Sequence, residues 1–231
     1  MADLDVTIPL FPLESVVLFP TLSVPLYIFE PRYRQMTRDA LEGDRRIGMV
    51  AVIPQPDLDM TGDPRVFDIG CEGQITAAEE QDDGTFKILL SGTRRFRILD
   101  ETPPSGERLY RLARTLPLPE EQAPAQPDQL LALRRSLAAL LRQAMVDTGA
   151  TPQPSPDSDQ VEASLERLSQ VDDDCFGNLL AQSVGFGVLE KQQLLEADNT
   201  LDRYGILELL LRFQIAAAAG PIPSTGPNLP Q

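Results

Sequence analysis

The stretch Ile8–Gly48, IPLFPLESVVLFPTLSVPLYIFEPRYRQMTRDALEGDRRIG, decides the fold class. Short runs of β-branched and aromatic residues alternate there with prolines at positions 9, 12, 20 and 25. A proline lacks the N–H donor that a central strand needs, so these runs predict edge strands, bulges or turns. Pro31 and the apolar residues that follow it at three-to-four spacing predict a helix, which Gly43 would end in a left-handed conformation.

Further short strands are expected as far as residue 116. Asp83-Gly84 between two apolar runs is typical of a tight hairpin, and Gly70 and Gly73 indicate a bulge or a sharp bend. Gly92 indicates another turn. The predicted strands cover residues 7–10, 16–18, 24–29, 47–53, 66–78, 86–90, 96–99 and 110–116. Many short, bent strands with one early helix favour a small curved β-sheet or pseudo-barrel.

The periodicity changes after residue 118. Residues 119–128 form a proline-rich connector, which we expect to be extended and semi-rigid. Apolar stripes at helical spacing then predict a helical bundle subdomain over residues 129–219, and the four prolines of residues 220–231 predict a disordered tail. The expected fold class is therefore α+β, with a β-rich domain over residues 1–118 followed by the helical subdomain.

Three blocks in a fixed order form a specific signal: PLFPL at 9–13, IFEPRY at 28–33 and GTRRFRI at 92–98. Together with GCEGQI at 70–75 and KQQLLE at 191–196, they resemble the amino-terminal domain of the ATP-dependent protease Lon, over about residues 8–213. The resemblance implies the same pseudo-barrel architecture and a role in substrate recognition. It implies the recognition domain alone, because these residues contain no motif of an ATPase or a Ser–Lys protease module.

The composition removes several classes of chemistry. The chain has no histidine, which excludes His-based acid–base catalysis, Ser-His-Asp triads and His metal ligands. Two distant cysteines, Cys71 and Cys175, are too few for a Cys-rich zinc site, and no P-loop or dinucleotide-binding motif is present. We therefore expect no catalytic residue, no cofactor and no metal site.

The net charge and the lengths of the apolar runs bear on nucleic-acid binding, membrane insertion and localisation. A net charge of −15 disfavours binding to nucleic acid, because phosphate binding needs an excess of positive charge. Apolar runs are too short for a membrane span, and no secretory signal precedes residue 20, so we expect a cytoplasmic protein. The oligomeric state stays open.

Two groups of charged residues offer alternatives to this interpretation. Carboxylates at 79–80, 82–83, 120–121 and 172–174 have the chemistry to bind Ca²⁺ or Mg²⁺, but surface and helix-start roles are favoured because no EF-hand loop is present. Arg94, Arg95 and Arg97 form the densest basic run. A solvated strand face beside acidic neighbours is favoured for them over contact with a carboxylate or a phosphate.

The apolar run Leu18–Leu26 surrounds a Pro-Thr turn, although loop tips are usually polar. Such a tip marks either a loop folded back on the core, which is the more common case, or an exposed contact patch. On the second alternative the candidate peptide-binding residues are Phe19, Leu22, Val24 and Leu26.

These observations predict a non-catalytic polypeptide-binding module. Its partners would be apolar segments of unfolded or partly folded polypeptides, with a protease or a chaperone as a further partner. The alternative is a small-ligand-binding protein or an enzyme that uses carboxylate and arginine groups. RNA binding is a third hypothesis, against which the negative charge argues.

Overall fold

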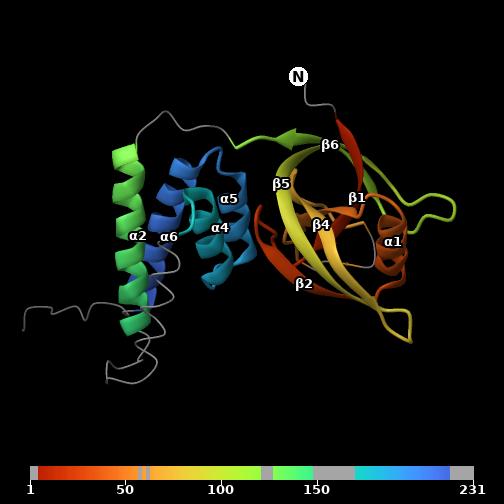
Figure 1. Cartoon of the computed structure of the whole chain (residues 1–231), viewed down its shortest axis with the longest axis horizontal. Coiled ribbons are helices and arrows are strands. Elements are labelled where there is room, and N and C mark those ends of the chain that lie inside the picture. The colour runs from red at the N-terminus through yellow and green to blue at the C-terminus, as the bar shows by residue number, and fades with distance from the viewer. Residues whose placement is uncertain (1–4, 57–58, 61–62, 121–126, 148–169, 219–231) are drawn as a thin grey trace, which may run out of the picture. The chain divides into compact units, whose positions relative to one another are not determined.

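The computed structural model describes residues 5–56, 59–60, 63–120, 127–147 and 170–218. The chain divides into two compact units. Unit 1 contains Met1–Ala123 and Val171–Arg203, and unit 2 contains Pro124–Gln170 and Tyr204–Gln231. The strands are β1 (Val6–Leu13), β2 (Ser23–Ile28), β3 (Arg46–Ala51), β4 (Ile69–Glu80), β5 (Phe86–Thr102) and β6 (Leu112–Leu118). The helices are α1 (Pro31–Glu42), α2 (Pro127–Asp147), α4 (Asp173–Ser183), α5 (Val188–Glu196) and α6 (Thr200–Ala218) (Figure 1).

The six strands of unit 1 form one strongly curved, mixed sheet. Its strand order is β2-β5-β4-β3-β1-β6, and β5 also pairs with β6. Five strands therefore close into a ring, and β2 is added at its side as an edge strand on β5. Closure depends on the length of β5, which has 17 residues and bends from β2 to β6 (Figure 1). The α+β class and the curved sheet predicted from the sequence are confirmed.

The prolines of the first strands lie where the ladder of hydrogen bonds is interrupted. Pro25 lies in β2, at the edge of the sheet, as the sequence predicts. β1 contains Pro9 and Pro12 and lies between two strands, but it changes partner at its centre. Residues 6–9 pair with β6, whereas residues 10–13 pair with β3. Each half of β1 therefore has one side without a strand, which makes a missing N–H donor tolerable there.

The turn predicted at Gly92 is wrong, because β5 continues through this residue. The reason for a glycine is a close approach of two backbones. A Cβ atom at position 92 would lie 2.2 Å from the carbonyl oxygen of Phe19, closer than any real contact. The Gly92 N–H donates to the carbonyl of Leu22 at 2.7 Å, so the glycine lets the turn that follows Phe19 lie directly against β5.

Other local predictions have mixed outcomes. The Asp83-Gly84 hairpin is confirmed, with Gly84 at φ 75° between β4 and β5. A register shift between Glu72 and Gly73 confirms the predicted bulge. Gly43 follows α1 with φ −101°, so the left-handed residue predicted there is wrong; Arg45 adopts φ 62° instead. Residues 16–18 form no strand.

The interior of the ring contains one compact apolar cluster. It consists of Ile8, Leu10, Val50, Val52, Val66, Phe96 and Ala113. Because side chains alternate along a strand, the inward position of Phe96 places Arg95 and Arg97 on the outer face of β5. On that outer face Arg95 is buried, whereas Arg97 is exposed.

Unit 2 is described by α2 and the greater part of α6. The long helix predicted after the connector is confirmed as α2, and Ser136 on α2 donates to Glu208 on α6 at 2.5 Å. α4 and α5 belong to unit 1, with the sheet. The domain boundaries expected at residues 118 and 128 stay a prediction, and the helix expected near residues 159–168 and the tail 220–231 lie outside the described residues. No helix in the described ranges is long and apolar enough to cross a membrane.

Candidate functional site

The apolar turn singled out from the sequence is folded back on the core. Phe19 is fully buried, Leu22 and Val24 are buried, and Leu26 is half-buried. The Thr21 N–H donates to the carbonyl of Gly92, and the side-chain amide of Asn178 on α4 donates to the carbonyl of Pro20 at 3.1 Å. This placement matches the core alternative. A peptide-binding role for the four residues stays a prediction, but three of them have almost no surface to offer a partner.

The next residues along the chain form an exposed apolar surface. Tyr27 is 54% exposed and Phe29 is 60% exposed, and their rings stack with centroids 6.1 Å apart. Leu89 on β5 is exposed as well, and it is the register partner of Pro25 on β2. Because directly opposite residues share one face of a sheet, these four residues form one surface, which we call the aromatic face.

The aromatic face lies on an edge strand. Among the described strands β2 pairs only with β5, so its other side is open. A proline in an edge strand removes a donor that an added strand would need, and Pro25 therefore disfavours strand addition. Contacts through the rings of Tyr27 and Phe29 are unaffected by this, and exposed aromatic side chains are typical of protein–protein contact sites.

The sequence contained the signal for this face. Pro25, Tyr27 and Phe29 alternate with Val24 and Ile28, so one set had to point inward. The sequence did not show that the set with the larger aromatic rings would be the exposed one. Val24 and Ile28 are buried, which fixes the other set at the surface.

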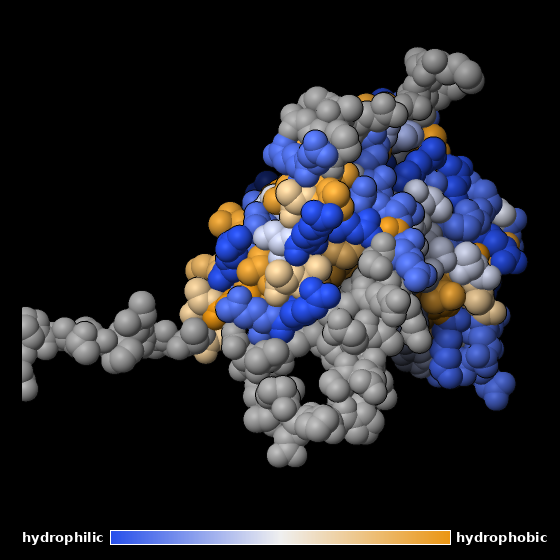
Figure 2. Space-filling model, turned by 60° about the vertical axis from the view of Figure 1, so that its left-hand side comes forward, coloured by the Kyte–Doolittle hydropathy of each residue, from blue (hydrophilic) through white to orange (hydrophobic). Residues whose placement is uncertain are grey.

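Unit 2 also exposes apolar residues. Leu131 on α2 is 47% exposed, and Leu209 and Phe213 on α6 are 66% and 69% exposed. On the side of the molecule shown in Figure 2, hydrophobic residues lie interspersed with hydrophilic ones. Nothing in the described residues shows what would cover Leu209 and Phe213, so the candidate site is placed in unit 1.

The run of arginines at 94–97 is not the uniformly solvated face that the sequence predicts. Arg95 is 3% exposed, and its guanidinium pairs with Glu120 at 2.9 Å. Arg203, which is 1% exposed, pairs with the other oxygen of the same carboxylate. The Arg95 guanidinium also donates to the backbone carbonyls of Leu195, in the last turn of α5, and of Ala197 and Asp198, which lie between α5 and α6.

These contacts indicate that Arg95 stabilises the fold. Burial lowers the pKa of Arg95, and the carboxylate of Glu120 opposes that change. The hydrogen bonds satisfy carbonyls at the end of α5 that have no partner inside the helix. Arg95 therefore fastens the chain between α5 and α6 to the outer face of β5. The prediction of a solvated face is wrong for Arg95, because the sequence does not show which segment packs on it.

The carboxylate clusters at 79–80, 82–83 and 172–174 have the surface and helix-start roles favoured from the sequence, whereas Glu120 of the cluster at 120–121 pairs with the buried Arg95 and Arg203. Asp172 caps α4 by accepting from the N–H of Cys175 at 2.8 Å. Asp83 accepts from Thr85 within the hairpin, and these hydrogen bonds lower the pKa of Asp83. Glu80 pairs with Arg38 at 2.9 Å. Within the described ranges, no three acidic or cysteine side chains gather in a way that could hold a metal ion.

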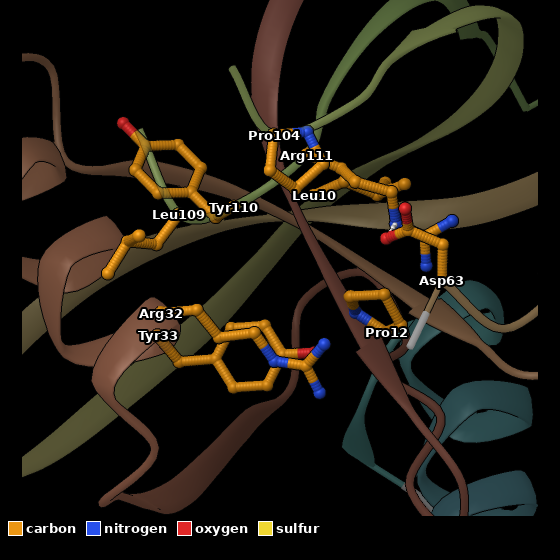
Figure 3. A pocket seen from close by; sticks show the side chains of 9 residues that line it. All are labelled: Leu10, Pro12, Arg32, Tyr33, Asp63, Pro104, Leu109, Tyr110 and Arg111. Atoms are coloured by element: carbon orange, nitrogen blue, oxygen red, sulfur yellow. Dashed lines mark ion pairs between the residues drawn. The ribbon is translucent and has the colours of Figure 1, made fainter. Parts of the chain in front are cut away.

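Figure 3 shows a small cleft between α1 and the loop that precedes β6. Its volume of about 10 Å³ leaves room for about one water molecule. Arg111 pairs there with Glu101 at 2.8 Å and with Asp63 at 3.6 Å, the pair drawn in Figure 3. Arg32 pairs with Glu30 at 2.9 Å. Both cations are neutralised, so this cleft does not support the small-ligand or enzyme alternative.

Comparison with known proteins places this geometry in a family. The chain matches the model of the ATP-dependent protease La (LON) substrate-binding domain over residues 7–212. The chain therefore belongs to the LON substrate-binding domain family. It is 26% identical to a Lon protease of Flavobacterium johnsoniae over 201 residues and 28% identical to one of Xanthomonas oryzae over 207 residues. These matches cover 87% and 88% of this chain but 23% and 22% of the relatives, so the chain spans less than a quarter of their length.

Two solved structures have the same fold. The N-terminal domain of a Lon protease from the Mycobacterium avium complex matches with a TM-score of 0.65 and 18% identity, over 89% of this chain and 98% of that one. A Lon N-terminal domain protein from Xanthomonas campestris matches with a TM-score of 0.59 and 23% identity, over 90% and 98%. The resemblance to Lon noted in the sequence is thus confirmed.

Proposed function

We propose that the chain is a non-catalytic polypeptide-binding module that holds apolar segments of unfolded or partly folded proteins at the aromatic face. The single observation that supports this most is the stacked, exposed pair formed by Tyr27 on the open edge strand β2 and Phe29 directly after it. The family adds support, since its model describes a substrate-binding domain.

The size of the aromatic face suits a weak and reversible contact. Full burial of an aromatic or leucine side chain contributes about 1.5–3 kcal/mol, and association itself costs a large part of such a sum. Three side chains, those of Tyr27, Phe29 and Leu89, therefore favour transient holding over tight binding. Transient holding fits a module that passes a polypeptide on to a protease or a chaperone, and we include such a partner, in the cytoplasm, in the proposal.

The test compares a change in the aromatic face with a matched change elsewhere. The variant Tyr27→Ser with Phe29→Ser should bind a reduced, carbamidomethylated model protein at least tenfold more weakly than the wild type. The control is Leu99→Ser, since Leu99 is 44% exposed on β5 outside the aromatic face. Binding is measured by fluorescence polarisation of the labelled unfolded protein.

Thermal unfolding followed by circular dichroism checks that both variants stay folded. Because the replaced side chains are exposed, each variant should unfold within a few degrees of the wild type. The proposal fails if the wild type does not bind the unfolded protein. It also fails if the double variant binds as well as the Leu99 control.

A further inference from the structure

Unit 1 contains an open hollow of about 450 Å³ at the outer face of β5, and its lining residues are neither those of the aromatic face nor those of the small cleft between α1 and the loop before β6. Arg97 on β5 and Arg65 line it, together with the apolar side chains of Ile53 and Phe67. The backbone there is held by the N–H of Ile53, which donates to the carbonyl of Arg65 at 2.9 Å, and by the N–H of Phe67, which donates to Ala51 at 3.0 Å. The hollow is therefore built on paired backbone.

Both arginines in the hollow are unpaired among the described residues. In the part of the chain that the structure describes, neither Arg65 nor Arg97 forms an ion pair or a side-chain hydrogen bond. A shortage of carboxylates is not the reason, because the chain has 35 acidic and 20 basic residues. The neighbouring Arg94 and Arg95 on the same strand do find carboxylates, at 3.1 Å and 2.9 Å.

Two carboxylates share the hollow without neutralising the arginines. Asp68 and Glu196 line it, but neither lies within 4.0 Å of a guanidinium nitrogen of Arg65 or Arg97. Glu196 already accepts a hydrogen bond from Gln192 at 2.7 Å. With two cations and two anions the hollow has no net formal charge, so one bound carboxylate leaves it with a single negative charge, whereas a run of acidic residues would add several and is disfavoured.

The apolar lining of the hollow, formed by Ile53 and Phe67, indicates which chemical group of a ligand should lie next to its carboxylate. Ile53 and Phe67 are half-buried and offer part of their side chains to the hollow. A guanidinium binds a carboxylate with two parallel hydrogen bonds, and an apolar wall next to it suits an aliphatic side chain. Both groups occur together, on one Cα atom, in the C-terminal residue of a polypeptide that ends in an apolar side chain. The volume lies within the range of about 300–1,000 Å³ that is typical of binding pockets.

We infer that this hollow binds the free C-terminus of a polypeptide that ends in an apolar residue, with Arg97 and Arg65 on the carboxylate. The inference rests on the proposed polypeptide-binding function, and it assigns that function a second contact. The aromatic face would hold an apolar segment, whereas the hollow would select the end of a chain.

The test uses three fluorescein-labelled peptides of ten residues with a neutral, flexible body. The first ends in Ala-Leu with a free carboxylate, the second is its C-terminal amide, and the third is an amide with one internal aspartate. Fluorescence polarisation should show the free acid binding to the wild type about tenfold more tightly than either amide. The double variant Arg65→Gln with Arg97→Gln should lose this preference.

The matched control is Arg45→Gln. Arg45 is exposed and also lacks an ion-pair partner among the described residues, so this change lowers the positive charge without touching the hollow. It should keep the preference for the free acid. Far-ultraviolet circular dichroism verifies that all variants are folded.

The outcomes separate this inference from the proposed function. If the wild type holds an unfolded protein but binds acid and amide equally, the inference is overturned and the proposed function stands. If the peptide with the internal aspartate binds as well as the free acid, the assignment to a chain end is overturned. If the free acid binds through the arginines and unfolded protein is not held, the proposed function fails while the carboxylate site remains.

Discussion

Two regions of unit 1 contain the same residue types with opposite exposure. In the covered region, which comprises the turn at residues 19–22 and Arg95, both Phe19 and Arg95 are buried. In the open region, which comprises the aromatic face and Arg97, both Phe29 and Arg97 are exposed. The two phenylalanines lie ten residues apart in similar apolar runs, and the two arginines share one face of β5.

The difference comes from what packs on each region. Asn178 on α4 donates to the carbonyl of Pro20, and carbonyls in the last turn of α5 and directly after it accept from the guanidinium of Arg95. No described segment makes such a bond to Phe29 or Arg97. Residue type therefore does not decide whether these side chains stabilise the fold or are available to a partner. Whether another helix or loop packs on them decides this.

The largest expected effect compares the two phenylalanines. Phe19→Ala should lower the free energy of unfolding by about 3–5 kcal/mol, because it leaves a cavity in a packed core. Phe29→Ala should change it by less than about 1 kcal/mol, because its ring is exposed. Urea unfolding followed by circular dichroism measures both, since the chain has no tryptophan to report by fluorescence. Equal losses in the two variants would remove the distinction between the regions.

The two arginines give the next largest contrast. Arg95→Met should cost about 2–3 kcal/mol, because it leaves buried carbonyls without a donor and leaves the carboxylate of Glu120 with Arg203 as its remaining partner. The value is below that of a fully buried pair, since Glu120 keeps part of its surface in water. Arg97→Met should stay within about 0.5 kcal/mol of the wild type in the same urea titration. A cost at Arg97 that matches the one at Arg95 would show that the hollow is part of the folded core.

A smaller effect concerns α4, the helix that covers the turn. Asp172→Ala should lower the stability by about 1 kcal/mol, because the N–H of Cys175 loses its acceptor at the helix start. The control is Glu79→Ala, an exposed carboxylate on β4 for which no change is expected. If α4 covers the turn, amide hydrogen exchange in residues 19–22 should be faster in the Asp172→Ala variant than in the Glu79→Ala variant. Equal exchange rates in the two variants would argue against this covering role of α4.

The smallest effect concerns Tyr110, a buried group outside both regions. Burial, together with the hydrogen bond to Asp39 at 2.8 Å, raises the pKa of Tyr110 from 10.0 to about 12. The folded state therefore keeps the phenol proton over a range in which the unfolded state loses it. This contribution is complete below pH 10 and falls as the pH rises towards 12.

Tyr110→Phe should remove that fall. Its urea midpoint should change less than that of the wild type between pH 10 and pH 11. At pH 7 the variant should lose about 0.5–1.5 kcal/mol, the usual value of one hydrogen bond. Identical pH profiles for the two proteins would show that the phenol is as well solvated in the folded chain as in the unfolded one.

Local features of the sequence were sufficient wherever neighbouring residues determine the structure. Pro31 at the first turn of α1 and the hairpin at Gly84 follow from backbone preferences alone. The α+β class and the curvature of the sheet follow from many short runs broken by prolines and glycines. For the candidate site, the alternation Pro25, Tyr27, Phe29 was visible, but not which side of the strand would be covered.

The tertiary structure alone decided which residues of the sheet and its turns are buried beneath α4 and α5. Gly92 is typical of a turn in the sequence, but in the structure the backbone of Phe19 lies against it, and Arg95 donates to the carbonyl of Leu195, which lies 100 residues further along the chain. The amide that bonds to Pro20 comes from 158 residues away. Apart from residues 16–18 and the turn expected at Gly92, the sequence by itself determined which segments are strands and helices, because backbone preferences act over a few residues. Burial, and with it the separation of a structural arginine from a free one, depends on packing between distant segments, which local preferences do not encode.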